Sequence, residues 1–324
     1  MRKGCGNLRG EKVGSSMSGI GVILNPYSKN YKNNPDKLDH IAFIIGDKAS
    51  CKPTDDIADL YRVADGFKSR GIDILAISGG DGTIHCTLTA FLKVYGEKPL
   101  PKITFLRGGT LNTIAATLGI FGTTEKLLSQ LLMRYHEDKP FIEKKLRLLK
   151  VNDEYGCIFG NGLVYNFMEA YYKNSTVNPV MAAKTLAHSV SSAMTHGRLS
   201  QKLFERFDAE VIVDGQPWPF ANYCSIFAAS IRQLGLGFNV FYEMMRQNEA
   251  FHAYGLSLMP RHILSHLKKL HDGKPTGSDG ILEAPAHEMI IKLEKPLPYT
   301  VDGDMLDAVD HFRITSGPEI TVLV

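Results

Sequence analysis

Two glycine-rich turns, each placed between an apolar run and a helical pattern, constrain the fold of this chain most strongly. Gly-Gly-Asp-Gly-Thr at 79–83 follows the apolar run 72–77, and Gly-Gly-Thr-Leu-Asn at 108–112 follows the run 103–106. Short apolar runs that alternate with helical patterns are typical of parallel strands joined by helical crossovers. The sequence therefore predicts an α/β layer with both turns at the carboxyl ends of its strands.

Other segments of the first half predict the remaining elements of this layer. Apolar runs predict further strands at 20–24, which Asn25-Pro26 ends, and at 41–45. Helical spacing, caps and stop signals predict helices from Thr54 to Gly71, from the first glycine-rich turn to about Tyr95, from the second to Leu118, and from Thr123 or Thr124 through Tyr135.

After the charged stretch 143–145 the pattern changes to short strands separated by turn residues, several of them Asp-Gly. Strands are predicted at 150–151, 156–159, 209–213, 223–228, 289–293, 299–301 and 320–324, with helical stretches near 179–205 and 260–271. We therefore expect an N-terminal Rossmann-like domain with a parallel sheet, followed by a mostly β domain.

Composition excludes several classes of protein. The 324 residues are 44% hydrophobic and 22% charged, as in globular domains, and the net charge of +3 does not indicate a nucleic-acid partner. Residues 1–18 are polar and glycine-rich, which predicts a flexible N-terminus without a secretory signal, and no apolar run approaches a membrane span. The five scattered cysteines indicate free thiols, so we expect a cytoplasmic protein.

The turn at 79–83 is suited to binding phosphate. Its glycines let a ligand approach the backbone, and N–H groups at the start of a helix can hold phosphate oxygens. The spacing is neither that of a dinucleotide-binding GxGxxG motif nor that of a P-loop. Asp81 would hold a metal ion, handle a substrate proton or simply cap the helix. In the second turn Thr110 and Asn112 are either caps or ligand contacts, and Arg107 either faces phosphate or is solvated. Two such turns facing one crevice favour a nucleotide.

Three segments taken in order resemble one family. Asn-Pro-Tyr-Ser at 25–28, the Gly-Gly-Asp-Gly-Thr turn and Gly-Thr-Leu-Asn at 109–112 are similar to motifs of the diacylglycerol kinase catalytic-domain family, which includes bacterial lipid kinases, sphingosine kinases and ceramide kinases. The resemblance implies an α/β ATP-binding domain over 19–145 and a β-sandwich lipid-substrate domain over 146–324.

The resemblance also implies a site for ATP and Mg²⁺ over the first turn. The residues that it assigns to the nucleotide are Asn25, Ser28, Thr54, Gly79, Gly80, Asp81, Gly82, Thr83, Ile84, His85, Gly109, Thr110 and Asn112. Asp302-Gly303-Asp304 looks like the family's Asp-Gly-Glu motif, which makes Asp304 the candidate base that takes the proton of a lipid hydroxyl, assisted by Asp81. Without the resemblance, the same residues indicate a hairpin turn.

Three departures from the family's pattern leave catalytic competence open. His85-Cys86 replaces Asn-Glu, Asn248-Glu249-Ala250 stands where the family has an Asp-Asp-Gly segment tied to magnesium, and Gly160-Asn161-Gly162 lacks an acidic residue. The ligands of the metal are therefore not assigned.

Some candidates outside these motifs have two interpretations. Phe167, Met168, Tyr171 and Tyr172 would line an acyl-chain cleft or pack in the core. The basic amphipathic stretch 261–270 would pack on its own core or lie on a membrane surface, and its His262 and His266 lack the partners of a familiar metal site. Cys86, near a helix start, would have a lowered thiol pKa or be packed.

We expect an ATP-dependent lipid kinase that phosphorylates a lipid such as diacylglycerol or a sphingoid base in the cleft between the domains. The lipid must leave a bilayer, so peripheral membrane contact follows. Pairing of exposed sheet edges would give a homodimer. One alternative is an NAD kinase-like enzyme with a soluble substrate, against which the Gly-Thr-Leu-Asn segment argues. The other is a nucleotide- or lipid-binding regulatory protein that has lost catalysis.

Overall fold

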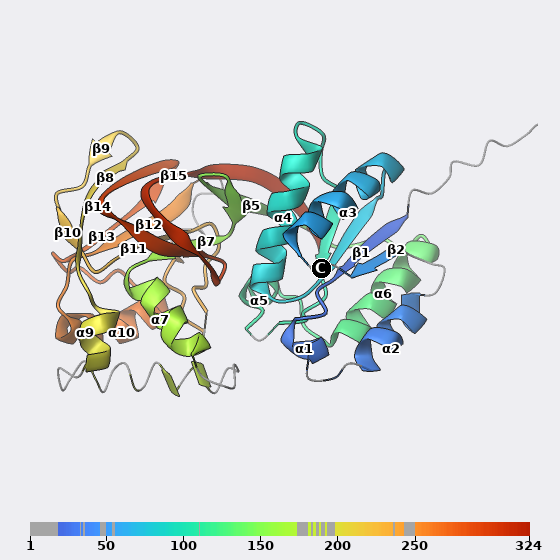
Figure 1. Ribbon diagram of the computed structural model, residues 1–324, viewed down its shortest axis with the longest axis horizontal. Coiled ribbons are helices and arrows are strands. Elements are labelled where there is room, and N and C mark those ends of the chain that lie inside the picture. Colours follow the sequence, from blue (N-terminus) through green and yellow to red (C-terminus); the bar gives the residue numbers. More distant parts are fainter. Residues whose placement is uncertain are drawn as a thin grey trace, which may run out of the picture.

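The computed structural model describes residues 19–32, 34, 36–45, 50–53, 56–109, 111–173, 181–182, 184–185, 188, 192, 198–235, 237–242 and 250–324. An α/β part, built mainly by the first half of the chain, lies beside a β-rich part built by the second (Figure 1). Of the helices among these residues, none has the length and apolar character needed to span a bilayer.

Four parallel strands form the sheet of the α/β part. In spatial order they are β2 (Ser50–Pro53), β1 (Ile20–Leu24), β3 (Ile74–Ser78) and β4 (Lys102–Phe105). Every residue of β1 and β3 is buried. Continuous burial is typical of parallel strands covered on both faces, so the predicted α/β layer is confirmed.

Helices pack on both faces of this sheet (Figure 1). Leu75 and Ile77 of β3 join one core cluster, and Ile74 and Ala76 join another, because successive side chains of a strand point to opposite faces. The first cluster includes side chains of α3 (Ile57–Arg70), α4 (Asp81–Tyr95) and α5 (Thr113–Thr117), and the second includes side chains of α2 (Asp36–Ile45) and α6 (Thr124–His136). The short helix α1 (Lys29–Lys32) follows β1.

The prediction of a strand at 41–45 is wrong, since these residues end helix α2. Ile41 and Ile45, four positions apart, are buried, whereas Phe43 between them is 83% exposed. This is helical spacing, which a five-residue apolar run alone does not distinguish from a strand.

The predicted start of the next helix, Thr54, lies outside the described residues. Asp56 caps α3 by accepting a hydrogen bond from the Asp59 N–H at 2.7 Å. Gly71 ends α3 as predicted.

The β-rich part contains more strands than predicted, and they are longer. They are β5 (Glu143–Val151), β6 (Glu154–Gly156), β7 (Ile158–Asn161), β8 (Phe207–Val213), β9 (Gln216–Pro217), β10 (Asn222–Tyr223), β11 (Ser225–Ala229), β12 (Phe251–Leu256), β13 (Ile281–Ala286), β14 (Glu288–Val301) and β15 (Asp304–Leu323). Helices α7 (Leu163–Tyr172), α9 (Arg198–Leu203) and α10 (Pro260–Asp272) accompany them.

Strand β14 joins two groups of strands into two packed layers. Its residues 289–293 pair with β8 and its residues 299–301 pair with β7, with register shifts against β15 in between. Phe159 of β7, Val211 of β8 and Ile291 of β14 meet in one core cluster, so the layers share a core as in a sandwich. The predicted strands 289–293 and 299–301 are therefore two ends of one bent strand.

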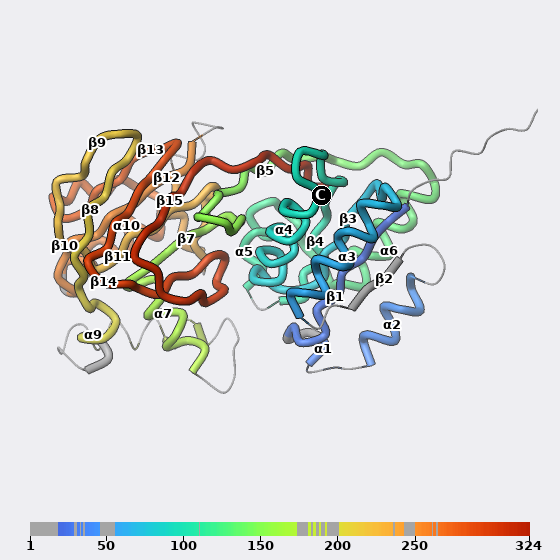
Figure 2. Tube along the Cα trace, turned by 45° about the horizontal axis from the view of Figure 1, so that its top comes forward, coloured from blue at the N-terminus to red at the C-terminus, as the bar shows by residue number. Residues whose placement is uncertain are grey.

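The last strand connects the β-rich part to the α/β part (Figure 2). β15 begins as the hairpin partner of β14, pairs antiparallel with β5 along its second half, and at Val322 pairs in parallel with Ile103 of β4. The end of β15 thus adds to the parallel sheet that β1–β4 form. The domain boundary at residue 145 stays a prediction, because β5 begins at Glu143 and runs through it.

A histidine buried in the β-rich part makes stability depend on pH. Burial lowers the pKa of His252 to about 4, and Glu283, 3.8 Å away, does not offset this. In the unfolded chain the histidine pKa is about 6.5, so between about pH 6.5 and 4 the unfolded state binds a proton that the folded state does not. This contribution to the free energy of unfolding is fully present above about pH 6.5 and is lost as the pH drops toward 4. The loss is roughly 3 kcal/mol.

We expect His252→Phe, which suits the aromatic neighbours Phe241, Tyr242 and Tyr254, to remove this part of the acid destabilisation. Urea unfolding between pH 4 and 7.5 measures it. Parallel curves of unfolding free energy against pH for the variant and the original protein would contradict the assignment.

Candidate functional site

A cavity of about 610 Å³ is lined by residues of both parts of the molecule. Its polar end includes the first turn at 80–83, Gly109 of the second turn, and the hairpin turn 302–304 between β14 and β15. Its apolar end is lined by side chains of α7, α10 and neighbouring strands of the β-rich part. A large apolar cavity with a few convergent polar groups is the usual form of a ligand site.

The two glycine-rich turns touch through their backbones. The Gly108 N–H donates to the Gly79 carbonyl at 2.8 Å. A Cβ on Gly109 would lie 2.2 Å from the Cα of Gly80, and a Cβ on Gly80 would lie 3.2 Å from the Cα of Gly109. A side chain at Gly109 would therefore overlap the backbone of Gly80, and a side chain at Gly80 would crowd the backbone of Gly109. The structure therefore brings the two turns together as the topology predicted.

The segment after β1 packs against both turns. The side-chain amide of Asn25 donates to Thr83 Oγ1 at 2.9 Å, and the Asn25 carboxamide oxygen accepts from the Tyr27 N–H. The hydroxyl of Ser28 is buried, has no hydrogen-bond partner among the described residues, and lies 3.4 Å from where a Cβ on Gly108 would be. Asn25, Ser28 and Thr83 all line the cavity, and their assignment to a nucleotide stays a prediction.

Asp81 caps a helix, but not its own. Its carboxylate accepts hydrogen bonds from the N–H groups of Thr113 at 2.9 Å and Ile114 at 3.2 Å, at the start of α5. Burial raises the pKa of Asp81, which these hydrogen bonds and the Arg107 charge oppose. The capping role that the sequence left open thus joins the first turn to the helix that follows the second.

Asn112 closes the second turn by a pair of hydrogen bonds to Gly109. Its Oδ1 accepts from the Gly109 N–H at 3.0 Å and its Nδ2 donates to the Gly109 carbonyl at 2.9 Å, with Asn112 itself in the left-handed conformation. Its side chain is therefore a structural element of the turn. Ile84, another predicted contact, packs in the core behind the turn, and Thr110 lies outside the described residues.

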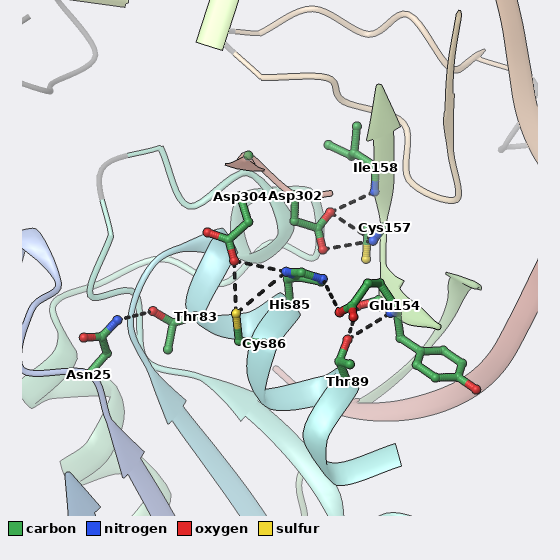
Figure 3. A network of polar contacts seen from close by, with 12 residues as sticks. Asn25, Thr83, His85, Cys86, Thr89, Glu154, Cys157, Ile158, Asp302 and Asp304 are labelled. Atoms are coloured by element: carbon green, nitrogen blue, oxygen red, sulfur yellow. Dashed lines mark hydrogen bonds and ion pairs between the residues drawn. The ribbon is translucent and has the colours of Figure 1, made fainter. Parts of the chain in front are cut away.

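Asp304 stands at the centre of a polar network (Figure 3). Its Oδ2 lies 3.1 Å from His85 Nδ1 and accepts a hydrogen bond from the Cys86 thiol at 3.0 Å. The other ring nitrogen of His85, Nε2, lies 3.2 Å from Glu154 Oε2. The ring of His85 is 1% exposed, so it is held between two carboxylates from distant parts of the chain.

The network keeps both of these carboxylates ionised. Burial alone would lower the pKa of His85, but its contacts with Asp304, Cys86 and Glu154 raise that pKa well above its usual value. Burial would likewise raise the pKa values of Asp304 and Glu154, and the contacts with His85 lower both instead. The idea of an activated thiol is wrong, since burial raises the pKa of Cys86.

Asp302 anchors the hairpin turn that carries Asp304. Its carboxylate accepts from the N–H of Cys157 at 2.9 Å and from the N–H of Ile158 at 2.8 Å, and burial raises its pKa to about 7. Asp302 and Gly303 both have positive φ, and Val301 pairs with Asp304 across the turn. This is the Asp-Gly hairpin that the sequence indicated, here fixed to β7.

The apolar end of the cavity explains two segments that the sequence left open. Phe167, Met168, Tyr171 and Tyr172 of α7 all line the cavity, and the Tyr172 hydroxyl donates to the Gly303 carbonyl at 3.1 Å, so α7 reaches from the apolar end to the hairpin turn. Ile263 and Leu270 of α10 also line it and are buried. The apolar face of α10 thus packs inside the protein, so the structure supports the core interpretation of 261–270 and not the membrane-surface one.

Other residues singled out in the sequence are not among the described residues that line the cavity. Asn248 and Glu249 lie outside the described residues, and Asn161 binds the Ile226 N–H at 2.9 Å to hold β7 against β11. Within the described residues, His262 and His266 join no cluster of metal-ligating side chains. Sequence reasoning missed Glu154, because nothing in its Asp-Glu turn indicates that strand pairing brings it to His85.

Comparison with known families and structures identifies this architecture. Residues 19–140 match the family model described as the diacylglycerol kinase catalytic domain. The predicted resemblance to this kinase family is confirmed. A search of curated proteins finds no match.

Solved structures extend the similarity to the whole fold. A "putative diacylglycerol kinase" from Bacillus anthracis str. Sterne has a TM-score of 0.70 at 16% identity, and the alignment covers 95% of this chain and 98% of that one. A second structure of that description gives 0.69 at 17% identity over 95% and 98%. A diacylglycerol kinase from the same organism gives 0.63 at 14% identity over 95% and 97%. At these identities the likeness shows the fold.

The contact between the turns predicts the effect of a single methyl group. Gly109→Ala places a Cβ 2.2 Å from backbone, so we expect a loss of about 1–3 kcal/mol in unfolding free energy. Gly66→Ala in helix α3 meets nothing within 4 Å and should instead stabilise by about 0.5–1 kcal/mol. Urea unfolding measures both, and equal effects of the two variants would refute the close contact.

Proposed function

We propose that this protein is an ATP-dependent lipid kinase that phosphorylates the hydroxyl of a lipid such as diacylglycerol or a sphingoid base. One observation carries the proposal. A single cavity has the glycine-rich turns and Asp304 at one end and aromatic and aliphatic side chains of the β-rich part at the other. A polar end joined to an apolar lining suits a substrate with a hydroxyl head and acyl chains.

The residues around the two turns fit the phosphates of ATP. Gly80 and Gly109 keep Cβ atoms away from the point where the turns meet, and the first N–H groups of α4 have no partners within the helix. Ser28 contributes a buried hydroxyl without a partner among the described residues, and Asn25 fixes the Thr83 hydroxyl. These groups would bind phosphate oxygens by hydrogen bonds and orient the nucleotide toward Asp304.

Asp304 is the base in this proposal. It lines the cavity, and its contacts with His85 and Cys86 lower its pKa, so it is ionised at neutral pH. An ionised carboxylate in hydrogen-bond reach of a primary alcohol can take its proton as the phosphoryl group transfers. Asp81 takes no proton in this proposal. It helps by keeping α5 and the second turn in place, because its carboxylate binds the first N–H groups of α5.

The described carboxylates do not by themselves form a magnesium site. Asp81 and Asp302 are each bound to two backbone N–H groups. Mg²⁺ in kinases commonly keeps several waters and binds substrate phosphates, with one or two protein carboxylates. We therefore propose that Mg²⁺ enters with ATP and offsets its charge.

The lining of the cavity also supports contact with a membrane. Tyr27, Ile57 and Tyr172 line the cavity and are nevertheless 66%, 61% and 43% exposed. Exposed apolar side chains at a cavity are the groups that would contact the acyl chains of a bilayer. We propose that the protein docks peripherally on a bilayer at these residues when it takes up its lipid.

The first test is phosphate transfer from labelled ATP, with Mg²⁺, to a panel of lipid alcohols in mixed micelles, with NAD as the soluble alternative. A labelled lipid is the expected result and gives the substrate class. Labelled NAD would make the chain a soluble-substrate kinase. ATP binding without any transfer would contradict the kinase and favour a regulatory role.

Removing the charge of the base should stop turnover. Asp304→Asn should lower kcat by at least about 100-fold while ATP affinity, measured by calorimetry, stays nearly the same. Asp307→Asn, an exposed aspartate on the same strand, is the matched control and should leave kcat unchanged. If Asp304→Asn retains full turnover, Asp304 is not the base.

Filling the apolar end should change which lipids are accepted. Leu267→Trp enlarges a side chain of α10 that lines the cavity, so lipids with long acyl chains should lose about tenfold or more in kcat/KM relative to short ones. Lys268→Trp, at the exposed neighbouring position, is the control and should keep the original preference. The ratio of kcat/KM for two chain lengths measures the effect. An unchanged ratio in Leu267→Trp would place the acyl chains elsewhere.

A further inference from the structure

Three donor atoms of different chemistry converge at the polar end of the cavity. They are His85 Nδ1, Cys86 Sγ and Asp304 Oδ2, and all three lie within 4.8 Å of one another. The separations are 3.1 Å from nitrogen to oxygen, 3.0 Å from sulfur to oxygen and 3.9 Å from sulfur to nitrogen. Among the described residues, this is the group whose donor atoms are close enough to share one cation.

These separations are near those of a tetrahedral zinc site. Bond lengths of about 2.3 Å to sulfur and about 2.0–2.2 Å to nitrogen and oxygen give edges of roughly 3.4–3.6 Å between ligand atoms. Shifts of a few tenths of an ångström in the side chains would make room for the ion. Nitrogen and sulfur donors suit Zn²⁺ and related cations, whereas Mg²⁺ takes oxygen ligands.

The surroundings of His85 provide an independent reason to consider a metal. Its Nε2 lies 3.2 Å from Glu154 Oε2, and Lys93 lies 3.5 Å from the other oxygen of that carboxylate. A histidine that binds a metal through one ring nitrogen usually gives the other N–H to a carboxylate, which fixes the ring. In the buried ring of His85, Nδ1 is directed at Cys86 and Asp304, and Nε2 has the Glu154 carboxylate at ion-pair distance, without hydrogen-bond geometry (Figure 3).

The site is also open to solvent and substrate. Cys86 and Asp304 line the cavity, so a cation bound to three protein ligands would have its fourth position toward the space where a substrate hydroxyl is expected. Three protein ligands with one open position are the arrangement of exchangeable and catalytic zinc sites.

We propose that His85, Cys86 and Asp304 bind a thiophilic divalent cation of the Zn²⁺ class, and that its binding blocks the lipid kinase reaction by occupying Asp304. The second part of this proposal rests on the proposed function, and the first does not. Binding replaces the thiol proton of Cys86 and any proton between His85 and Asp304, and these protons pass to solvent. Affinity should therefore increase as the pH rises.

Co²⁺ is the probe for the binding site, because a thiolate bound to cobalt gives a charge-transfer band in the near ultraviolet. We expect the reduced, full-length protein to show this band with one equivalent of Co²⁺ and to lose it when Zn²⁺ is added. Cys86→Ser should abolish the band. Cys224→Ser, which removes a buried cysteine that does not line the cavity, should retain it.

A conservative substitution of Glu154, which contacts His85 but is not a proposed ligand, tests whether the three side chains coordinate the metal. Glu154→Gln keeps all three ligands but weakens the contact to His85, so it should reduce Zn²⁺ affinity about 10–100-fold, as measured by competition with a chromophoric chelator. Absence of the cobalt band in the original protein, its survival in Cys86→Ser, or unchanged Zn²⁺ affinity in Glu154→Gln would overturn the site.

The effect on catalysis is measured separately, at free Zn²⁺ concentrations fixed by a chelator buffer. Expressed as the ratio of rates with and without Zn²⁺, inhibition should follow the binding curve, and its midpoint should move 10–100-fold higher in Glu154→Gln. Inhibition with the same midpoint in both proteins would overturn the regulatory part. A cobalt band in a protein without kinase activity would leave the metal site standing and refute the proposed function instead.

Discussion

The backbone contact between Gly80 and Gly109 is the constraint on which the reacting end of this molecule depends. Because the two turns touch without side chains between them, β3 and β4 can place α4 and α5 side by side at one edge of the sheet. Asp81 then reaches across from one turn to hold the helix of the other. The groups that the two turns contribute to the cavity's polar end take their positions from this approach, whereas Asp304 takes its position from the hairpin that Asp302 fixes to β7.

Three aspartates meet near that end, and their surroundings give them different roles. Asp81 and Asp302 are bound by backbone N–H groups and hold a helix and a hairpin in place, and burial raises the pKa of each. Asp304 is instead bound by a histidine and a thiol, whose contacts lower its pKa. The groups that hold each carboxylate therefore separate the two structural aspartates, Asp81 and Asp302, from Asp304, the one suited to chemistry. Residue type alone does not distinguish these three residues.

Local signals in the sequence predicted most of the α/β part and the polar end of the site. Glycine-rich turns, the Asp-Gly hairpin and helix stop signals act over a few residues, so they can be recognised without knowing the partners. The strand assigned to 41–45 was wrong because a short apolar run has no clear period. The cap that Asp81 provides for α5 and the contact between His85 and Glu154 depend on strand pairing between distant segments, which no local pattern encodes.

The path of β15 has a consequence for how the molecule folds. Thr104 of β4 bonds to Leu323 across 219 positions of sequence, and Val322 is the pairing partner of Ile103. During synthesis the sheet of the α/β part therefore has an open edge at β4 until β15 has been made. Contacts of such long sequence separation slow folding, and an unpaired edge can join other chains in the meantime. A chaperone that shields β4 until β15 is available would therefore raise the yield of folded protein.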